Sequence, residues 1–116
     1  MNIVILTGRL TKAPELKTTN NGLSVVSNTL AVDRGFGDKK TTDFIPVVFW
    51  RGIADTVAKY CNKGSKLTVS GTLQSRTYEV RDGTRTAYEV HVSEMELPPK
   101  GEPFDKPSVN EDDLPF

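Results

Sequence analysis

Aromatic side chains set among basic ones are the residues of this chain whose types and positions suggest chemistry. Tyr78 shares the polar face of a predicted strand with Arg76, and Phe36 lies inside the glycine-rich segment 35–40. Neither position suits a core residue, whereas an aromatic ring on a basic β-surface can stack on a nucleobase. Each stacked base contributes about 1–3 kcal/mol, with little dependence on which base it is. The two rings therefore indicate a surface for unpaired nucleic acid.

Two more aromatic residues lie on a predicted strand over 42–50 that is apolar on both faces. Its alternating residues form two rows: Ile45, Val47 and Phe49 on one face, and Phe44, Val48 and Trp50 on the other. Such a strand is covered by core on one side and by a ligand or another subunit on the other. Taken singly, Phe44 and Trp50 fit a core position as well as a stacking platform, so both interpretations stay open at this point.

Basic residues that could track phosphates are spread along the chain. They are Arg9, Lys12, Lys17, Arg34, Arg51, Lys63 and Arg76. Each is an ordinary solvated charge if taken alone. Residues 1–97 carry 13 basic and 10 acidic side chains, a net charge of +3, and residues 98–116 carry a net charge of −3. A basic body with an acidic tail suggests an anionic partner and a separate interaction segment.

The sequence contains no combination of residues typical of a catalytic site. Cys61 falls on the apolar side of a predicted helix, where a buried thiol is expected rather than a nucleophile. His91 shares a strand face with Glu89 and Arg85, as a surface or interface residue would. No nucleophile–base pair and no phosphate-binding glycine loop with a lysine is found, and one Cys with one His is too few ligands for zinc. We expect no enzymatic activity, no metal and no cofactor.

Length and composition narrow the class of protein. A chain of 116 residues suits one domain, and its single Cys cannot form an internal disulfide. The longest apolar run, 45–50, is far shorter than the roughly 20 residues of a membrane span. The first residues carry no basic leader typical of a signal peptide. We expect a soluble cytoplasmic protein without membrane contact.

Turn and strand signals predict an all-β domain with one helix. The strands are expected over 2–10, 23–32, 42–50, 67–81 and 84–95. Leu67, Val69 and Leu73 should form the core face of the fourth strand, and Gly8 suggests a bulge or a close backbone approach in the first. The Asp82-Gly83 pair is a strong hairpin signal.

The helix follows from apolar spacing between the third and fourth strands. Ile53, Val57 and Cys61 recur at i, i+4 and i+8, and Gly64 stands where a C-terminal cap would be. Three strands, a helix and two strands is the order of a five-stranded Greek-key barrel of the oligonucleotide/oligosaccharide-binding (OB) type.

The C-terminal part of the chain changes character. Residues 98–110 are rich in proline and charge, which predicts a disordered linker after an OB domain over 1–97. Residues 111–116 form an acidic tip that includes Asp112, Asp113, Leu114, Pro115 and Phe116. A partner protein could bury Phe116 and pair a basic residue with its carboxylate. A solubilising tail is the alternative.

Several segments together resemble the bacterial single-stranded DNA-binding proteins. They are Leu6–Lys12, Pro14–Lys17, Thr29–Val32, Asp43–Arg51, Ala54–Tyr60, Lys63–Ser65, Val69–Leu73 and Asp112–Phe116. The resemblance implies a homotetramer of OB barrels that wraps single-stranded DNA with little sequence preference. It places stacking at Phe36, Phe44, Trp50 and Tyr78, and phosphate contacts best at Arg9, Arg51, Lys63 and Arg76. The tip would recruit proteins of DNA replication, recombination and repair, at the nucleoid of a bacterial cell.

Some features depart from that family or leave its details open. Phe36, Phe44 and Tyr78 stand where relatives often carry Trp, the linker is short, and Ala13 replaces a frequent Asp. A compact member of this kind is similar to phage-borne, plasmid-borne or competence-related versions. A dimer is the alternative to a tetramer. Other classes of function are a primosome-like adaptor whose barrel holds proteins, a barrel for RNA or oligosaccharide, and, last, a hydrolase of single strands.

Overall fold

The computed structural model describes residues 1–97, which form six strands, one α-helix and one 3-10 turn. The strands are β1 (Val4–Leu10), β2 (Lys17–Thr18), β3 (Ser24–Arg34), β4 (Thr41–Trp50), β5 (Lys66–Val80) and β6 (Gly83–Glu96). The helix α1 is Arg51–Tyr60 and the 3-10 turn η1 is Gly37–Lys39. The predicted linker (98–110) and acidic tip (111–116) lie outside the described residues.

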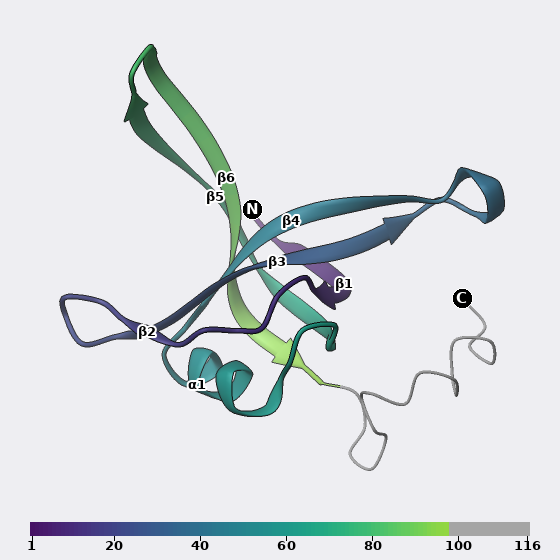
Figure 1. Cartoon of the computed structure of the whole chain (residues 1–116), viewed down its shortest axis with the longest axis horizontal. Helices are drawn as coiled ribbons and strands as arrows, with labels where there is room; N and C mark the ends of the chain where they lie inside the picture. The colour runs from purple at the N-terminus through teal and green to yellow at the C-terminus, as the bar shows by residue number, and fades with distance from the viewer. Residues whose placement is uncertain (98–116) are drawn as a thin grey trace.

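The strands close into a barrel (Figure 1). Their order is β1-β5-β6-β4-β3-β2, and β1 pairs with β3 as well as with β5. β4 and β6 run parallel, whereas the other paired strands of residues 1–97 are antiparallel. Apart from the two-residue β2, five long strands remain, with α1 between the third and the fourth. The predicted OB architecture is confirmed.

The core lies inside this barrel and is built from alternate residues of each long strand. Its largest side chains include Phe49, Leu10, Leu30 and Leu67, all almost completely buried. Val57 of α1 closes one end of the barrel. Cys61 follows α1 into the same core, and burial raises the pKa of its thiol above the ordinary value. Burial disfavours the thiolate, so the prediction of a buried structural thiol is confirmed.

Two hairpins extend well beyond the barrel as arms (Figure 1). The β3–β4 arm comprises residues 33–44 and the β5–β6 arm comprises residues 73–88. Leu73 was expected in the core because it shares the parity of Leu67 and Val69, but it is 45% exposed. That expectation was wrong because β5 has left the barrel at this point, so the alternation continues without a core to face.

Two local details differ from the sequence prediction. The helix ends at Tyr60, and Gly64, expected as its cap, lies in the following turn, where its N–H donates to the carbonyl of Leu10 at 2.8 Å. The hairpin turn lies at Arg81 and Asp82, because β6 already begins at Gly83.

Glycines permit two close backbone approaches in the barrel. A Cβ on Gly8 would overlap the carbonyl oxygen of Ala31, where β1 crosses from β5 to β3. A Cβ on Gly71 would overlap the carbonyl oxygen of His91, at an irregularity in the β5–β6 register. The predicted close approach at Gly8 is confirmed.

Gly71→Ala should therefore destabilise the barrel. We expect it to lower the free energy of unfolding by about 1–3 kcal/mol, since the backbone of β6 must move away. The control is Gly52→Ala in the first turn of α1, where an added Cβ meets nothing within 4 Å. It should leave stability unchanged or raise it by up to about 1 kcal/mol. Urea unfolding followed by circular dichroism measures both, and equal stability of the two variants would contradict this account.

Candidate nucleic-acid interface

The outward rows of β3 and β4 carry two of the predicted stacking residues. Trp50 lies opposite Val25 and Phe44 lies opposite Ala31 in the register. Directly opposed residues of paired strands project from the same side of the sheet. Phe44 is 65% exposed and Trp50 is half-buried. Val47 and Phe49 of β4 pack in the core cluster, so Phe44 and Trp50, which belong to the alternating row, point away from it.

The same outward face continues from β4 onto the β5–β6 arm. Val48 of β4 pairs with His91 of β6, and His91 lies opposite Thr72 of β5. Further along the arm, Tyr78 lies opposite Arg85. The side chains that line this face are Phe44, Trp50, His91, Glu89, Arg76, Tyr78 and Arg85, and they are called the outward face below.

A continuous set of contacts links the rings of Trp50 and Tyr78 on the outward face. The indole Nε1–H of Trp50 donates to Nδ1 of His91 at 3.1 Å, and Nε2 of His91 lies 3.1 Å from Oε1 of Glu89. The same carboxylate oxygen is 3.6 Å from Nε of Arg76. The guanidinium carbon of Arg76 lies 5.6 Å from the ring centre of Tyr78, a cation–π distance.

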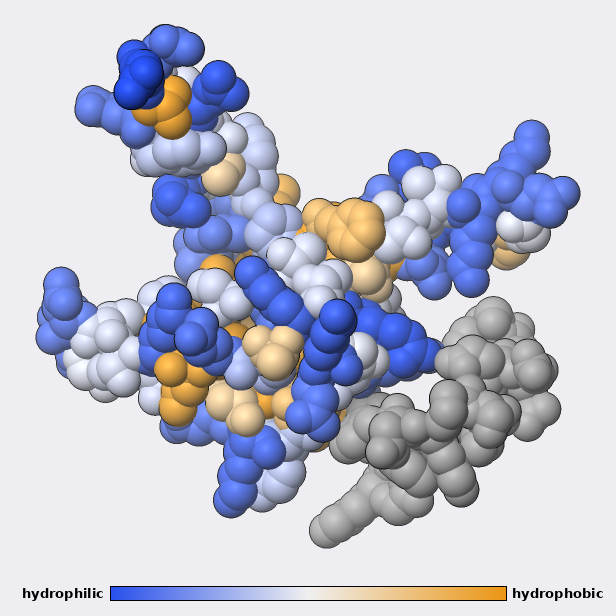
Figure 2. All heavy atoms as spheres, in the orientation of Figure 1, coloured by the Kyte–Doolittle hydropathy of each residue, from blue (hydrophilic) through white to orange (hydrophobic). Residues whose placement is uncertain are grey.

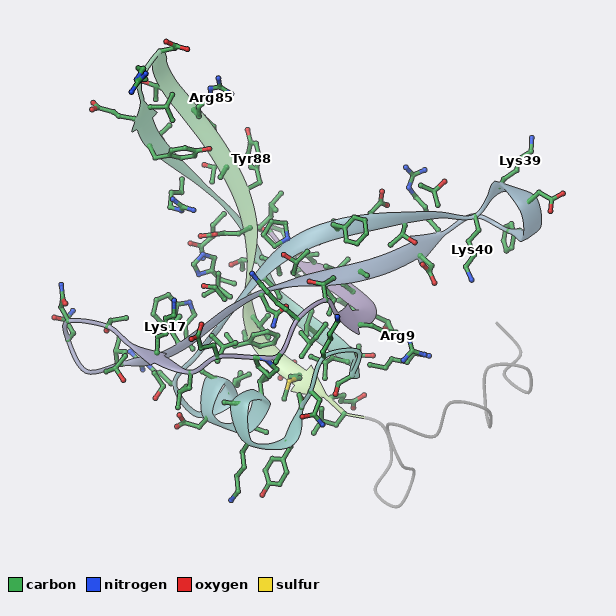
Figure 3. All side chains as sticks on the ribbon, in the orientation of Figure 1. Arg9, Lys17, Lys39, Lys40, Arg85 and Tyr88 are labelled. Atoms are coloured by element: carbon green, nitrogen blue, oxygen red, sulfur yellow. The ribbon has the colours of Figure 1, made fainter. Side chains whose placement is uncertain are left out.

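Basic residues flank this face at the barrel. Lys17 lies opposite Val25, next to the Trp50 position, and Arg9 lies opposite Ala31, next to the Phe44 position. Arg9 also pairs in register with Lys66 and donates to the carbonyl of Gly64 at 3.1 Å. Lys63 immediately precedes that glycine. Figure 3 shows Arg9 and Lys17 at the edges of the barrel body.

Two other residues predicted to bind, Phe36 and Arg34, lie on the β3–β4 arm but outside the outward face. Phe36, 91% exposed, lies at the tip of the β3–β4 arm, next to Lys39 and Lys40 (Figure 3). Arg34 lies on the opposite face of the arm from Phe44, because it pairs with Thr41 whereas Phe44 pairs with Ala31. Its Nε–H donates to Asp43 at 2.7 Å, which raises the pKa of the guanidinium above its ordinary value.

Lys12 follows β1 in the connection to β2 rather than lying on a strand. Its backbone carbonyl accepts a hydrogen bond from the side-chain amide of Asn28 at 3.0 Å. This bond fixes the path of the connection beside β3. The side chain of Lys12 is exposed.

Arg51 occupies a strained position where β4 becomes α1. Its φ is 56°, in the left-handed region that L-residues with side chains seldom adopt, and it is the one non-glycine residue of 1–97 that does so. A shallow hollow of about 650 Å³ opens here between α1 and β6, with Trp50, Arg51 and Met95 in its lining. Arg51 is exposed and lines this hollow together with Trp50.

Sequence reasoning did not single out three residues of the outward face: Glu89, His91 and Arg85. Their shared parity on the last strand was visible, but their neighbours depend on the register across the β5–β6 hairpin and on the parallel β4–β6 pairing. Lys66 was also not singled out, because its position opposite Arg9 depends on the β1–β5 register. Tyr88, 59% exposed, lies on the other face of the arm (Figure 3).

The polarity of the visible surface differs between the arms and the barrel body. Figure 2 shows hydrophilic side chains over most of both arms, with hydrophobic ones visible on the barrel body and at the base of the β3–β4 arm. Within residues 1–97, no three His, Cys, Asp or Glu side chains gather to hold a metal ion. No helix in that part of the chain is long and apolar enough to cross a membrane.

Comparison with known proteins shows the family to which this chain is similar. The model of the Single-strand binding protein family matches residues 1–98. The single-stranded DNA-binding protein of Bacillus cereus is 49% identical over 98 residues, covering 82% of this chain and 55% of its own length. Single-stranded DNA-binding protein 3 of Clostridium acetobutylicum is 51% identical over 88 residues, covering 73% of this chain and 61% of its own length.

Single-stranded DNA-binding protein 1 of Staphylococcus aureus is 44% identical over 98 residues, covering 82% of this chain and 60% of its own length. The chain thus spans about half to two thirds of the length of the curated relatives it matches. The matched part is the barrel with its two arms, the same part that carries the outward face. By this match, the chain belongs to the single-strand binding protein family.

Proposed function

We propose that this protein binds single-stranded DNA along the outward face, with little dependence on base sequence. The observation that carries the proposal is the row of exposed rings on β4 and on the β5–β6 arm, flanked by basic side chains. Bases stack on the rings, and the flanking cations neutralise phosphates. In OB folds, ligands bind across the second and third strands and the hairpin of the last two, which correspond here to β3, β4 and the β5–β6 arm.

Stacking and phosphate neutralisation act on different parts of the nucleotide, so they add to one another. The ring of Phe44 is 65% exposed and that of Tyr78 is 42% exposed, so each has a face available to a base. Because every base has a π-face, this contact discriminates little among sequences. Arg9, Lys17 and Arg51 flank the ring positions and would track the backbone.

Protein partners and cellular role form the second part of the proposal. We propose that the protein coats and protects single strands without catalysing a reaction, at the nucleoid in the cytoplasm of a bacterial cell. It would act in replication, recombination and repair. The acidic tip, Asp112–Phe116, would recruit partner proteins by inserting Leu114 and Phe116 into an apolar pocket with a basic rim.

Assembly into a homotetramer is also proposed, and β1 supports it. Ile3 and Ile5 are 63% and 66% exposed, although large apolar residues are usually covered. Over Val4–Gly8, β1 is hydrogen-bonded to β5 along one edge, and its pairing with β3 covers Arg9 and Leu10. An open strand edge beside exposed isoleucines favours pairing with another copy of this chain.

Removing an outward ring should weaken DNA binding without unfolding the protein. Phe44→Ala and Tyr78→Ala should each raise the Kd for a fluorescently labelled dT oligonucleotide by about 5- to 150-fold, the equivalent of about 1–3 kcal/mol of stacking. Since both rings are exposed, no core cavity is created. Fluorescence anisotropy measures the Kd at fixed salt.

The matched control is Tyr60→Ala, which removes an exposed ring from α1, away from the outward face. Its Kd should equal that of the unchanged protein. Unchanged affinity in both Phe44→Ala and Tyr78→Ala would remove the stacking model. Preferential competition by RNA or oligosaccharide over DNA would move the function to the corresponding ligand.

Arg51→Gly should weaken DNA binding without lowering the stability of the fold. Glycine adopts the left-handed conformation freely, so the free energy of unfolding should stay level or rise by up to about 1 kcal/mol. Loss of the guanidinium should weaken DNA binding and reduce the slope of log K against log salt by about 0.7. Urea unfolding and salt titrations of dT binding measure the two effects. Lys59→Ala, elsewhere on α1, should change neither, and a parallel fall in stability and affinity would refute this role.

A charge on the outer side of β1 should disturb assembly. We expect native mass spectrometry to report a tetramer for the unchanged chain and smaller species for Ile5→Glu, because burying an unpaired carboxylate at an interface is unfavourable. The control is Thr84→Glu at the exposed end of the β5–β6 arm, which should remain tetrameric. A monomeric unchanged chain at micromolar concentration would overturn the proposed assembly.

A further inference from the structure

We propose that His91 is a positioning residue that holds the indole of Trp50 in its stacking orientation, and that Glu89 in turn orients His91. The inference rests on the proposed binding of single-stranded DNA, and it assigns a role to two residues that need not touch the DNA. Three observations support it: the hydrogen bonds that fix one state of the imidazole, the relative orientation of the two rings, and the pairing of the Glu89 carboxylate.

The two hydrogen bonds of His91 require one and the same form of the ring. Nδ1 accepts the indole N–H of Trp50 at 3.1 Å, so Nδ1 carries no proton. In the neutral imidazole the proton is then on Nε2, which lies 3.1 Å from Oε1 of Glu89 and can donate to it. Both contacts are satisfied together, and neither ring nitrogen is left without a partner.

The rings of Trp50 and His91 meet through their edges. Their planes differ by 19° and their centroids are 6.1 Å apart, while the bonded nitrogens are only 3.1 Å apart. The hydrogen bond therefore lies close to the plane of the indole. It restrains rotation of the ring without covering the faces on which a base would stack. Fixing a side chain before binding lowers the entropy lost when the ligand arrives.

Glu89 supports this arrangement, and its negative charge is balanced, so it does not repel the phosphates of DNA. Its carboxylate is largely buried, with 17% of the side chain exposed, and it lies between His91 and the guanidinium of Arg76 at 3.6 Å. An unpaired carboxylate on this face would repel phosphates, whereas Arg76 balances its charge. Since Arg76 also lies over Tyr78, the same carboxylate helps to place the cation beside the second stacking ring.

The test uses the fact that the chain has one Trp, so its indole N–H gives one cross-peak in a ¹⁵N–¹H spectrum. In the full-length protein, His91→Leu removes the acceptor, while His91→Gln retains both an acceptor for Trp50 and a donor for Glu89. The exchange rate of the indole proton with water and the Kd for a dT oligonucleotide are measured for each. The other cross-peaks report whether the barrel is folded.

We expect His91→Leu to speed exchange of the indole proton at least about tenfold and to weaken dT binding about three- to tenfold, the range expected for one lost hydrogen bond. His91→Gln should restore both values to within about twofold. Tyr78→Ala should weaken dT binding and leave indole exchange unchanged. If His91→Leu does not fold, Glu89→Leu gives the same test, with faster indole exchange as its readout.

Unchanged indole exchange in a folded His91→Leu protein would overturn the proposal. Faster exchange with an unchanged Kd would also overturn it, since the bond would then serve the fold alone. Failure of the unchanged protein to bind dT would instead overturn the proposed function, and indole exchange would still decide whether His91 holds the ring.

Discussion

Closure of the barrel depends on β1, which pairs with β5 over most of its length and with β3 at its end. Where β1 passes from β5 to β3, the two backbones come so close at Gly8 that a Cβ atom there would overlap the carbonyl oxygen of Ala31. Once the barrel is closed, the inward residues of every long strand share one core. The outward row of β4 then has no place in that core, and so large rings such as Phe44 stay on the surface. The outward face is thus a consequence of how the fold closes.

The outward face combines residues that the chain keeps far apart. Trp50 ends β4, His91 lies on β6, and Arg76 and Tyr78 belong to the β5–β6 arm. They become neighbours because β4 and β6 run side by side in parallel at Val48 and His91. The electrostatic arrangement follows the same geometry. One carboxylate, Glu89, lies among the rings and is balanced by Arg76, whereas the flanking residues at the barrel are cationic. The face is therefore ordered internally and basic at its edges.

Sequence patterns predicted the barrel well, because strand alternation and the helix period report directly on which side chains are buried. They placed Phe36 and Tyr78 outside the core, and left Phe44 open between a core position and a stacking position. They failed where the chain leaves the barrel, as at Leu73, because alternation does not show how far a strand extends past its core. They also could not connect Trp50 with His91. That contact depends on the β4–β6 register and on two ring orientations, and neither is written in the spacing of one strand.

The parallel seam between β4 and β6 has a mechanical consequence. It comprises two register pairs, Val47 with Val90 and Val48 with His91, whereas each arm is a long antiparallel ribbon held together by its own hydrogen bonds. The two arms therefore diverge from a short parallel pairing, which lies two residues before Trp50 on β4. A stiff ligand lying across both arms would exert torque on that seam, and a strand supple enough to bend there would not. Unpaired strands bend far more easily than duplexes, so under the proposed function a single strand follows both arms at a lower bending cost than a duplex.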